Sequence, residues 1–288
     1  MASPIIFIVG ETASGKTSTS IKLAQTIGGE IICADSRTIY KYMDVGTAKP
    51  TISEQNETKH HLLDIIEPDQ QFSVSEFKDR AQKCIQDIIA KNKVPIVVGG
   101  TGLYINSLLY NYQFVSVNDT NVRYKIENMN DDEITTYIKN NNIDSTKVDV
   151  KNRRHFARYV ERGMTTPSNT KPIEGSLVLG LKLSREVLND RITKRVDQMF
   201  NDGFLEEVES VASKYGWDNS AMSGIGYSVA KSYFEGKSSI EEVKEAFIRR
   251  DMSLAKRQRT WFKRNPYIQW FDEPDKLNIY VENQLVKL

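Results

Sequence analysis

Cysteine is nearly absent from this sequence. Its 288 residues include only two, Cys33 and Cys84, each in an apolar run, so we expect no disulfide scaffold and a reducing compartment. Long hydrophobic runs are also missing, since residues 5–9 and 95–98 fall far short of the ~20 residues that span a bilayer. No basic segment precedes the first apolar run, so we expect no signal peptide, no membrane contact and a cytoplasmic location.

An excess of one charge is missing too, because 39 Lys and Arg face 38 Asp and Glu, which gives a formal net charge of +1. That balance argues against a uniformly basic nucleic-acid-binding chain. The cations are nevertheless unevenly placed. Residues 149–200 hold 11 Lys and Arg against 6 Asp and Glu, and residues 246–266 hold 7 against 1. This distribution favours a nucleic-acid partner that binds particular surfaces only.

Short apolar runs rich in β-branched residues predict buried strands. They lie at residues 4–9, 31–34, 93–98 and 176–183, and helical spacing of apolar residues separates them at 18–27 and 74–90. Strands that alternate with helices in this way predict an α/β fold, a doubly wound parallel sheet of the P-loop type.

The polar, Asn-rich segment that follows predicts a small helical insertion domain. We therefore divide the chain into a first part of the core at 1–117, an insertion at 118–162, and a return to the core with C-terminal helices at 163–288. From Arg185 to about Arg264 the pattern is helical, and Asn265-Pro266 ends it.

Residues 10–17, GETASGKT, match the phosphate-binding pattern G-x-x-x-x-G-K-[ST] between an expected strand and an expected helix. In this pattern glycines turn backbone N–H groups around a phosphate, Lys16 adds a positive charge, and the Thr17 hydroxyl can hold Mg²⁺. A glycine-rich turn without a ligand is the weaker alternative. The pattern predicts polyphosphate binding without saying which polyphosphate, by Gly10, Thr12, Ala13, Ser14, Gly15, Lys16 and Thr17, which the family resemblance below makes diphosphate-binding residues.

P-loop proteins that hydrolyse ATP usually carry a second strand that ends in a Mg²⁺-binding carboxylate. Here the strand at 93–98 ends in GGTG, residues 99–102, which argues against a motor-type ATPase or GTPase. Asp35 instead follows the neighbouring strand, where it would face the same crevice as the phosphate loop. We expect Asp35 to act as a general base, and capping the next helix is the competing role. The Thr101 hydroxyl could bind a leaving diphosphate, although a tight turn would need the same residues.

Cations and aromatic side chains are mixed at residues 151–162 and 247–264, a composition that suits RNA. A solvated helix face is the alternative for either stretch alone. His60 and His61 have no Cys or further His nearby in the sequence, so we expect structural histidines rather than metal ligands.

Taken in order, these motifs closely resemble the tRNA dimethylallyltransferases, also called tRNA isopentenyltransferases. The phosphate loop resembles the family's GPTASGKT, residues 35–40 its D-S-R-Q-x-Y, and residues 43–50 its MDIGTAKP. The match continues through HHLLD at 60–64, GGTGLYI at 99–105, a segment from Arg195 to Phe204, IGY at 225–227, and AKRQ at 255–258 with Trp261-Phe262. It spans about residues 4–265.

This resemblance implies transfer of a dimethylallyl group from dimethylallyl diphosphate, with Mg²⁺, to N6 of the adenosine 3′-adjacent to the tRNA anticodon. It implies catalytic roles for Asp35 as the base, and for Thr101 and Arg195 beside the departing diphosphate. The implied tRNA contacts are Asp35, Ser36, Arg37, Thr38, Thr101, Arg123, Arg154, Arg158, Lys256, Arg257 and Gln258. The resemblance also implies a P-loop catalytic core, and an insertion at 118–162 that grips the anticodon stem-loop of tRNA. We expect a monomer without an obligate protein partner.

Two departures from the family pattern affect substrate details. Glu11 replaces a proline and puts a carboxylate beside the diphosphate site, so we expect its side chain to point to solvent. Thr38 replaces a glutamine, which could alter base recognition.

Three other functions stay open at this point. They are a small-molecule kinase that uses ATP, a prenyltransferase that acts on free adenine nucleotides, and a nucleotide-gated RNA-binding protein without catalytic activity.

Overall fold

The computed structural model describes residues 4–114, 122–141, 143–153, 156–157, 159–160, 165–167 and 169–285. The chain divides into two units, one formed by residues 1–109 and 172–288 and the other by residues 110–171. Each is described by itself below. In the described residues we find no helix with both the length and the apolar character that a membrane span requires.

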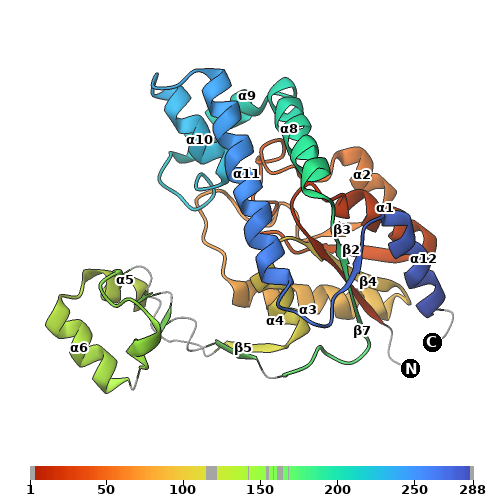
Figure 1. The fold of residues 1–288 in the computed structure, drawn as a ribbon, viewed down its shortest axis with the longest axis horizontal. Coiled ribbons are helices and arrows are strands. Elements are labelled where there is room, and N and C mark those ends of the chain that lie inside the picture. Colours follow the sequence, from red (N-terminus) through yellow and green to blue (C-terminus); the bar gives the residue numbers. More distant parts are fainter. Residues whose placement is uncertain are drawn as a thin grey trace. The chain divides into compact units, whose positions relative to one another are not determined.

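A six-stranded sheet forms the centre of the first unit (Figure 1). Its spatial order is β3-β2-β4-β1-β7-β8, and every neighbouring pair is parallel. The strands are β1 (Ile5–Gly10), β2 (Gly29–Cys33), β3 (His60–His61), β4 (Val94–Gly99), β7 (Ser176–Leu181) and β8 (Gln269–Phe271). The predicted parallel α/β fold is thus confirmed. The strand order changes direction at β1, and such a switch point opens a crevice at the carboxyl ends of the strands.

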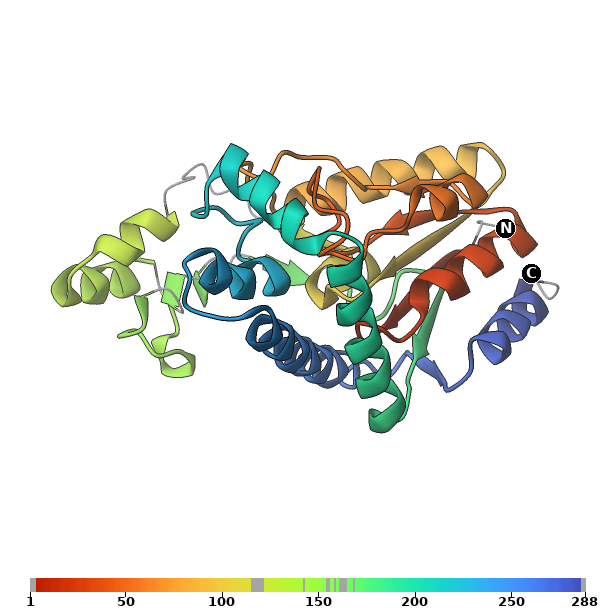
Figure 2. The same ribbon diagram turned by 90° about the horizontal axis from the view of Figure 1, so that it is seen from above.

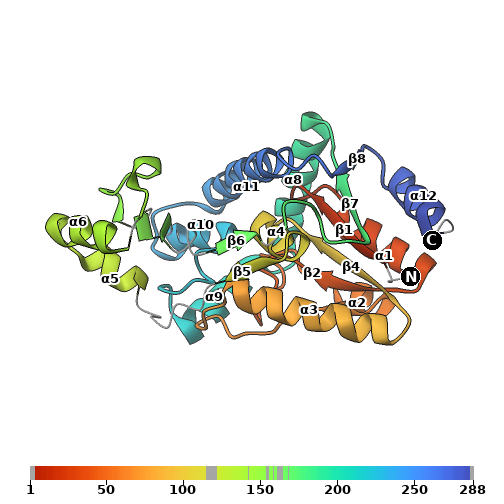
Figure 3. The ribbon, with the colours of Figure 1, turned by 90° about the horizontal axis from the view of Figure 1, so that it is seen from below.

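Helices cover both faces of this sheet (Figure 3). On one face α1 (Lys16–Ile27) and α12 (Pro274–Leu285) pack on apolar side chains of the strands, such as Ile8 and Val98. On the other face α3 (Val74–Ala90) packs on β2 and β4, with α4 (Gly102–Leu109) beside it. Burial on both faces explains why the strands have continuous apolar runs instead of alternating ones.

The stretch from Arg185 to Arg264, predicted to be helical, contains four separate helices. They are α8 (Arg185–Asn201), α9 (Phe204–Tyr215), α10 (Ile225–Phe234) and α11 (Ile240–Phe262). Gly203, Gly216 and Gly236 lie between them with positive φ, a conformation that glycine adopts without a Cβ penalty. Figure 2 shows α8 beside α11. The sequence pattern missed β3, β8, α2 (Ile52–Glu57), α4 and α12, because each is short or lacks clean periodicity.

One half-buried carboxylate of this helical layer fixes the loop that follows Tyr42. Glu207 of α9 accepts hydrogen bonds from the backbone N–H groups of Asp44, Val45 and Gly46 at 2.6–2.8 Å. It also accepts one from the Tyr227 hydroxyl at 2.6 Å. The loop is thereby held against the C-terminal helices at the edge of the crevice.

The second unit contains β5 (Tyr112–Phe114) paired with β6 (Thr165–Pro167), and the helices α5 (Val122–Asn128) and α6 (Asp131–Asn140) followed by a 3₁₀ turn, η1 (Ser145–Lys147). Its own apolar cluster is centred on Ile126, Ile134 and Phe156. Arg153, from the first basic stretch, bonds to Asp131 and to the Met129 and Val150 carbonyls, so it ties this unit together. The insertion expected at 118–162 lies within these bounds.

Candidate active site

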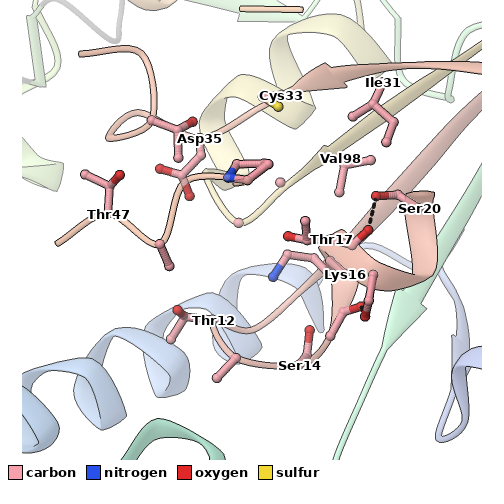
Figure 4. Close-up of a pocket in the computed structure, with 18 of the residues that line it drawn as sticks. Thr12, Ser14, Lys16, Thr17, Ser20, Ile31, Cys33, Asp35, Thr47 and Val98 are labelled. Atoms are coloured by element: carbon pink, nitrogen blue, oxygen red, sulfur yellow. Dashed lines mark hydrogen bonds between the residues drawn. The ribbon is translucent and has the colours of Figure 1, made fainter. Parts of the chain in front are cut away.

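A cavity of about 390 Å³ opens at the carboxyl ends of β1, β2 and β4 (Figure 4). The phosphate loop forms one side, and Asp35 lies across the cavity from it (Figure 4). Apolar side chains form another part of the lining: Ile31, Cys33, Ala48, Pro50, Val98 and Leu254. The cavity therefore offers a cationic, N–H-rich end and an apolar region side by side.

The phosphate loop turns sharply between β1 and α1. Gly10, Ala13 and Gly15 have φ values of 154°, 59° and 92°, and a Cβ on Gly10 would lie 2.7 Å from the Leu181 carbonyl oxygen. The turn leaves the N-terminus of α1 open to the cavity, which favours an anion. The Ser14 hydroxyl is fully buried and has no hydrogen-bond partner among the described residues. A loop with an unpaired buried donor fits a phosphate ligand.

Lys16 is the cation at the centre of this loop. Its Nζ donates to the Glu11 backbone carbonyl at 2.5 Å and borders the cavity. Burial lowers its pKa to about 8, an effect that the Asp35 carboxylate opposes and the Arg195 cation increases. A bound anion would supply the negative charge that the Lys16 ammonium lacks here.

Glu11 does not point to solvent, so that expectation was wrong. Its side chain is 3% exposed, and both carboxylate oxygens accept hydrogen bonds from the Arg259 guanidinium of α11. Arg259 also donates to the Leu183 carbonyl oxygen at 3.2 Å. The carboxylate beside the phosphate loop is thus neutralised by a bidentate partner, which removes the expected repulsion of a diphosphate.

Gln258, next to Arg259, joins two cavity loops. Its Oε1 accepts from the Thr12 N–H at 2.7 Å, and its Nε2 donates to the Gly100 carbonyl at 3.1 Å. Gln258 was predicted as a tRNA contact. In the structure both ends of its amide are bonded to the protein, one on the phosphate loop and one on the GGTG loop.

Asp35 and Thr101 lie at the ends of adjacent strands. Asp35 Oδ1 accepts from the Arg37 N–H at 2.8 Å, an Asx turn that orients the carboxylate. Thr101 Oγ1 accepts from the Ser36 N–H at 3.0 Å, which ties the two loops together. Gly99 is required at the crossing, since a Cβ there would lie 2.0 Å from the Ala34 carbonyl oxygen. This crossing brings the loops of Asp35 and Thr101 together.

Two arginines of α8 border the cavity. Arg195, a predicted catalytic residue, donates through Nη2 to Asp251 of α11 at 2.6 Å. Arg191 donates to the Ser14 carbonyl at 3.4 Å. The sequence interpretation missed Arg191 and Asp251, because nothing local signals a contact between α8 and either partner.

His60 borders the cavity, although we expected it to be structural. Its Nδ1 lies 2.7 Å from the Thr58 carbonyl oxygen, so this nitrogen carries the proton and donates. Its Nε2 is buried without a partner among the described residues, and burial lowers the histidine pKa. The neutral imidazole therefore presents an acceptor nitrogen.

The remaining predicted tRNA contacts lie in several settings. Lys256 and Arg257 are exposed on α11, Arg37 donates to the Ser220 carbonyl at 2.9 Å, and Thr38 is buried at the cavity. Ser36 lies beside Thr101, as described above. Arg123 belongs to α5, with its side chain outside the described part, and Arg154 and Arg158 lie outside the described residues.

Mg²⁺ would find oxygen ligands here but no complete protein cage. The Thr17 and Asp35 side chains border the cavity, while the described residues contain no group of three or more His, Cys, Asp or Glu that could hold a metal. Hard oxygen donors suit Mg²⁺, which keeps several waters and commonly binds through substrate phosphates. The residues present therefore fit a Mg²⁺ ion that arrives with a phosphorylated substrate.

The chain is similar to known proteins in both sequence and fold. The IPP transferase family profile matches residues 38–265. The chain is 40% identical over 296 residues to a tRNA dimethylallyltransferase of Acetivibrio thermocellus, over 95% of this chain and 94% of that protein. A solved tRNA delta(2)-isopentenylpyrophosphate transferase of Staphylococcus epidermidis has a TM-score of 0.75 at 36% identity, over 99% of both chains. A eukaryotic dimethylallyltransferase acting on tRNA has a TM-score of 0.80 at 26% identity, over 93% of this chain and 73% of that one.

Proposed function

The chain belongs to the IPP transferase family, and we propose that its cavity transfers a dimethylallyl group from dimethylallyl diphosphate to N6 of the adenosine 3′-adjacent to a tRNA anticodon. Its relatives are tRNA dimethylallyltransferases, so the chain is a prenyl-transferring enzyme that modifies tRNA. The observation that carries the assignment of residues is the cavity itself, where a phosphate loop, a carboxylate and apolar side chains meet.

The donor fits the two kinds of lining. Its diphosphate would lie on the phosphate loop, with the Lys16 ammonium, the α1 N-terminus and the Arg195 guanidinium around it, and the dimethylallyl group would lie against apolar side chains such as Ile31 and Val98. Thr17 would help to hold Mg²⁺, which supplies further positive charge to the departing diphosphate.

The reaction breaks the bond between the allylic carbon and the diphosphate oxygen and forms a bond between that carbon and N6. The electron pair of the broken bond leaves with the diphosphate, where Lys16 and Arg195 of the cavity lining would stabilise it, together with the hydroxyl of Thr101, which follows the lining residue Gly100. The N6 proton would pass to Asp35, whose Oδ1 is held by the Arg37 N–H. The target base must be unstacked to reach this carboxylate.

A small-molecule kinase would use the same loop for ATP. Its acceptor would need a site beside the phosphate loop, and here much of that lining is apolar, which suits a prenyl chain better than a hydroxylated acceptor. The glycines after β4 also leave the position of the usual Mg²⁺-binding carboxylate without one.

The decisive experiment supplies the full chain with labelled dimethylallyl diphosphate, Mg²⁺ and bulk tRNA, and maps the label after nuclease digestion. We expect the label on one adenosine next to the anticodon. The Asp35→Asn variant should transfer about 10²–10⁴-fold more slowly and still bind tRNA. Asp79→Asn, on the exposed face of α3, is the matched control.

Three results would contradict these assignments. Phosphorylation from ATP without prenyl transfer would favour the kinase. A higher rate on AMP than on an anticodon stem-loop would change the acceptor. Full activity of Asp35→Asn would remove Asp35 as the base.

A further inference from the structure

Asp251 is a buried carboxylate that belongs to none of the motifs described above. It lies on α11, is 4% exposed as a residue, and accepts a hydrogen bond from Arg195 Nη2 at 2.6 Å. Arg195 lies on α8 and borders the cavity, with its side chain 25% exposed. The carboxylate thus lies behind a guanidinium that faces the proposed diphosphate site.

Burying the Arg195–Asp251 ion pair costs desolvation free energy, which apolar contacts between the two helices would avoid. Burial raises the pKa of Asp251, although Arg195 opposes that rise, which means that the carboxylate is costly to keep charged in this place. Replacing a buried ion pair with apolar side chains is often neutral or stabilising. The same two helices are also joined by Lys244 and Asp197, an outlying ion pair of 3.8 Å. A purely structural purpose therefore does not account for Asp251.

The geometry restricts Arg195 without using all of its donors. A guanidinium has five N–H groups in a rigid plane, and a short hydrogen bond at Nη2 limits how that plane can turn. Arg195 Nε is buried and has no partner among the described residues. The bond to Asp251 therefore leaves the Nε donor unpaired within the described part of the chain, on a side chain that borders the cavity.

We propose that Asp251 is a positioning residue that holds the Arg195 guanidinium so that its free N–H groups face the oxygen that gains charge as the allylic C–O bond breaks. The proposal rests on the proposed function of Arg195. Orientation matters most in the transition state, where the charge on that oxygen develops. Attraction of the bound diphosphate depends mainly on the positive charge, which Arg195 keeps whether or not Asp251 is present.

The test compares Asp251→Asn with the wild-type enzyme in steady-state kinetics. Asparagine keeps the shape and an acceptor oxygen but loses the charge that fixes Arg195. We expect kcat to fall about 10–100-fold, as for other groups that orient a catalytic side chain. We expect KM for dimethylallyl diphosphate to change less than about threefold, because the Arg195 charge remains.

Asp197→Asn is the matched control, since it removes an ion pair between the same helices outside the cavity lining. Its kcat should stay within about twofold of wild type. The double variant Arg195→Ala/Asp251→Asn should be no slower than Arg195→Ala alone, because Asp251 acts through Arg195.

The outcomes separate the two proposals. If Arg195→Ala keeps the wild-type rate, the proposed function of Arg195 fails, and this inference fails with it. If Arg195→Ala is slow but Asp251→Asn keeps its kcat within twofold, only this inference is overturned. Losses that multiply in the double variant would also overturn it, as would a lower thermal stability of Asp251→Asn with unchanged kcat.

Discussion

The cavity has two walls that are built in different ways. One is the strand-end wall, made of the loops at residues 10–17, 35–38 and 99–102, which follow β1, β2 and β4. The other is the helical wall, where α8 and α11 supply Arg195 and Gln258 to the lining. Asp251 and Arg259 lie outside the lining and bond to Arg195 and Glu11. The first wall presents backbone N–H groups and the side chains of Lys16, Thr17 and Asp35, and the second presents the Arg195 guanidinium and the Gln258 amide.

The two walls hold their functional groups in place by different means. Strand ends in a parallel sheet meet at one edge, so Lys16, Thr17 and Asp35 hold their places through backbone geometry. The helical wall reaches the same loops only through side chains, as in the bonds from Gln258 to Thr12 and from Arg259 to Glu11. We therefore expect substitutions in the strand-end wall to lower activity, and those in the helical wall, apart from Arg195 and its partner Asp251, to lower mainly stability.

After Asp35→Asn, the largest effect should follow from Lys16→Ala. It removes the cation of the phosphate loop, whose Nζ lies beside the Glu11 carbonyl, and leaves the diphosphate without its nearest ammonium. We expect kcat/KM for dimethylallyl diphosphate to fall about 10²–10³-fold, the usual cost of losing one preorganised charge-stabilising donor. Steady-state kinetics measures this. A loss smaller than that of Gln258→Ala would contradict the ranking of the two walls.

Arg259→Ala should reduce stability most among the helical-wall variants. It leaves the 3%-exposed Glu11 carboxylate without its bidentate partner. We expect the free energy of unfolding in urea to fall by about 3 kcal/mol, near the lower limit for a broken buried ion pair. The control Arg249→Ala breaks an exposed pair with Glu245 on the same helix and should cost under about 0.5 kcal/mol.

A second variant shows whether the unpaired carboxylate is the cause. In Glu11→Ala/Arg259→Ala neither charge remains, so most of the lost stability should return. If the double variant is as unstable as Arg259→Ala, the loss comes from packing of the arginine side chain instead of from Glu11.

The sequence predicted the strand-end wall far better than the helical wall. The phosphate loop, Asp35 and Thr101 each follow a recognisable apolar strand, so their meeting could be deduced from topology. The Glu11–Arg259 pair joins residues 248 positions apart, and the Arg195–Asp251 pair joins residues 56 apart. Neither contact has a local signal, since their formation depends on how α8 and α11 pack on the sheet. The burial of Glu11 was misjudged for this reason.

Alkaline pH offers a smaller perturbation of the strand-end wall without mutation. Because burial lowers the pKa of Lys16 to about 8, the free enzyme loses this ammonium charge as the pH rises above that value. A neutral Lys16 attracts the diphosphate less, so kcat/KM for the donor should fall about tenfold between pH 7 and pH 9. Lys16→Arg keeps its charge over this range and should lack the decline. A decline that persists in Lys16→Arg would assign it to another group.

The smallest effect on kinetics should come from substitutions on the outer face of α11. They test whether this helix contacts tRNA on one face and the cavity loops on the other. Lys256 and Arg257 are exposed, whereas the adjacent Gln258 and Arg259 bond to cavity loops. If the outer cations contact tRNA phosphates, Lys256→Ala/Arg257→Ala should raise KM for tRNA about fivefold at low salt. The slope of log KM for tRNA against log salt concentration should also become shallower by about 1–2. KM for dimethylallyl diphosphate should not change, because the inner face of α11 is intact.

The control Lys22→Ala/Lys276→Ala removes two cations from exposed pairs elsewhere and should leave both KM values unchanged. Equal effects of the two double variants would mean that α11 adds only overall charge, and its outer face would then have no specific contact with tRNA.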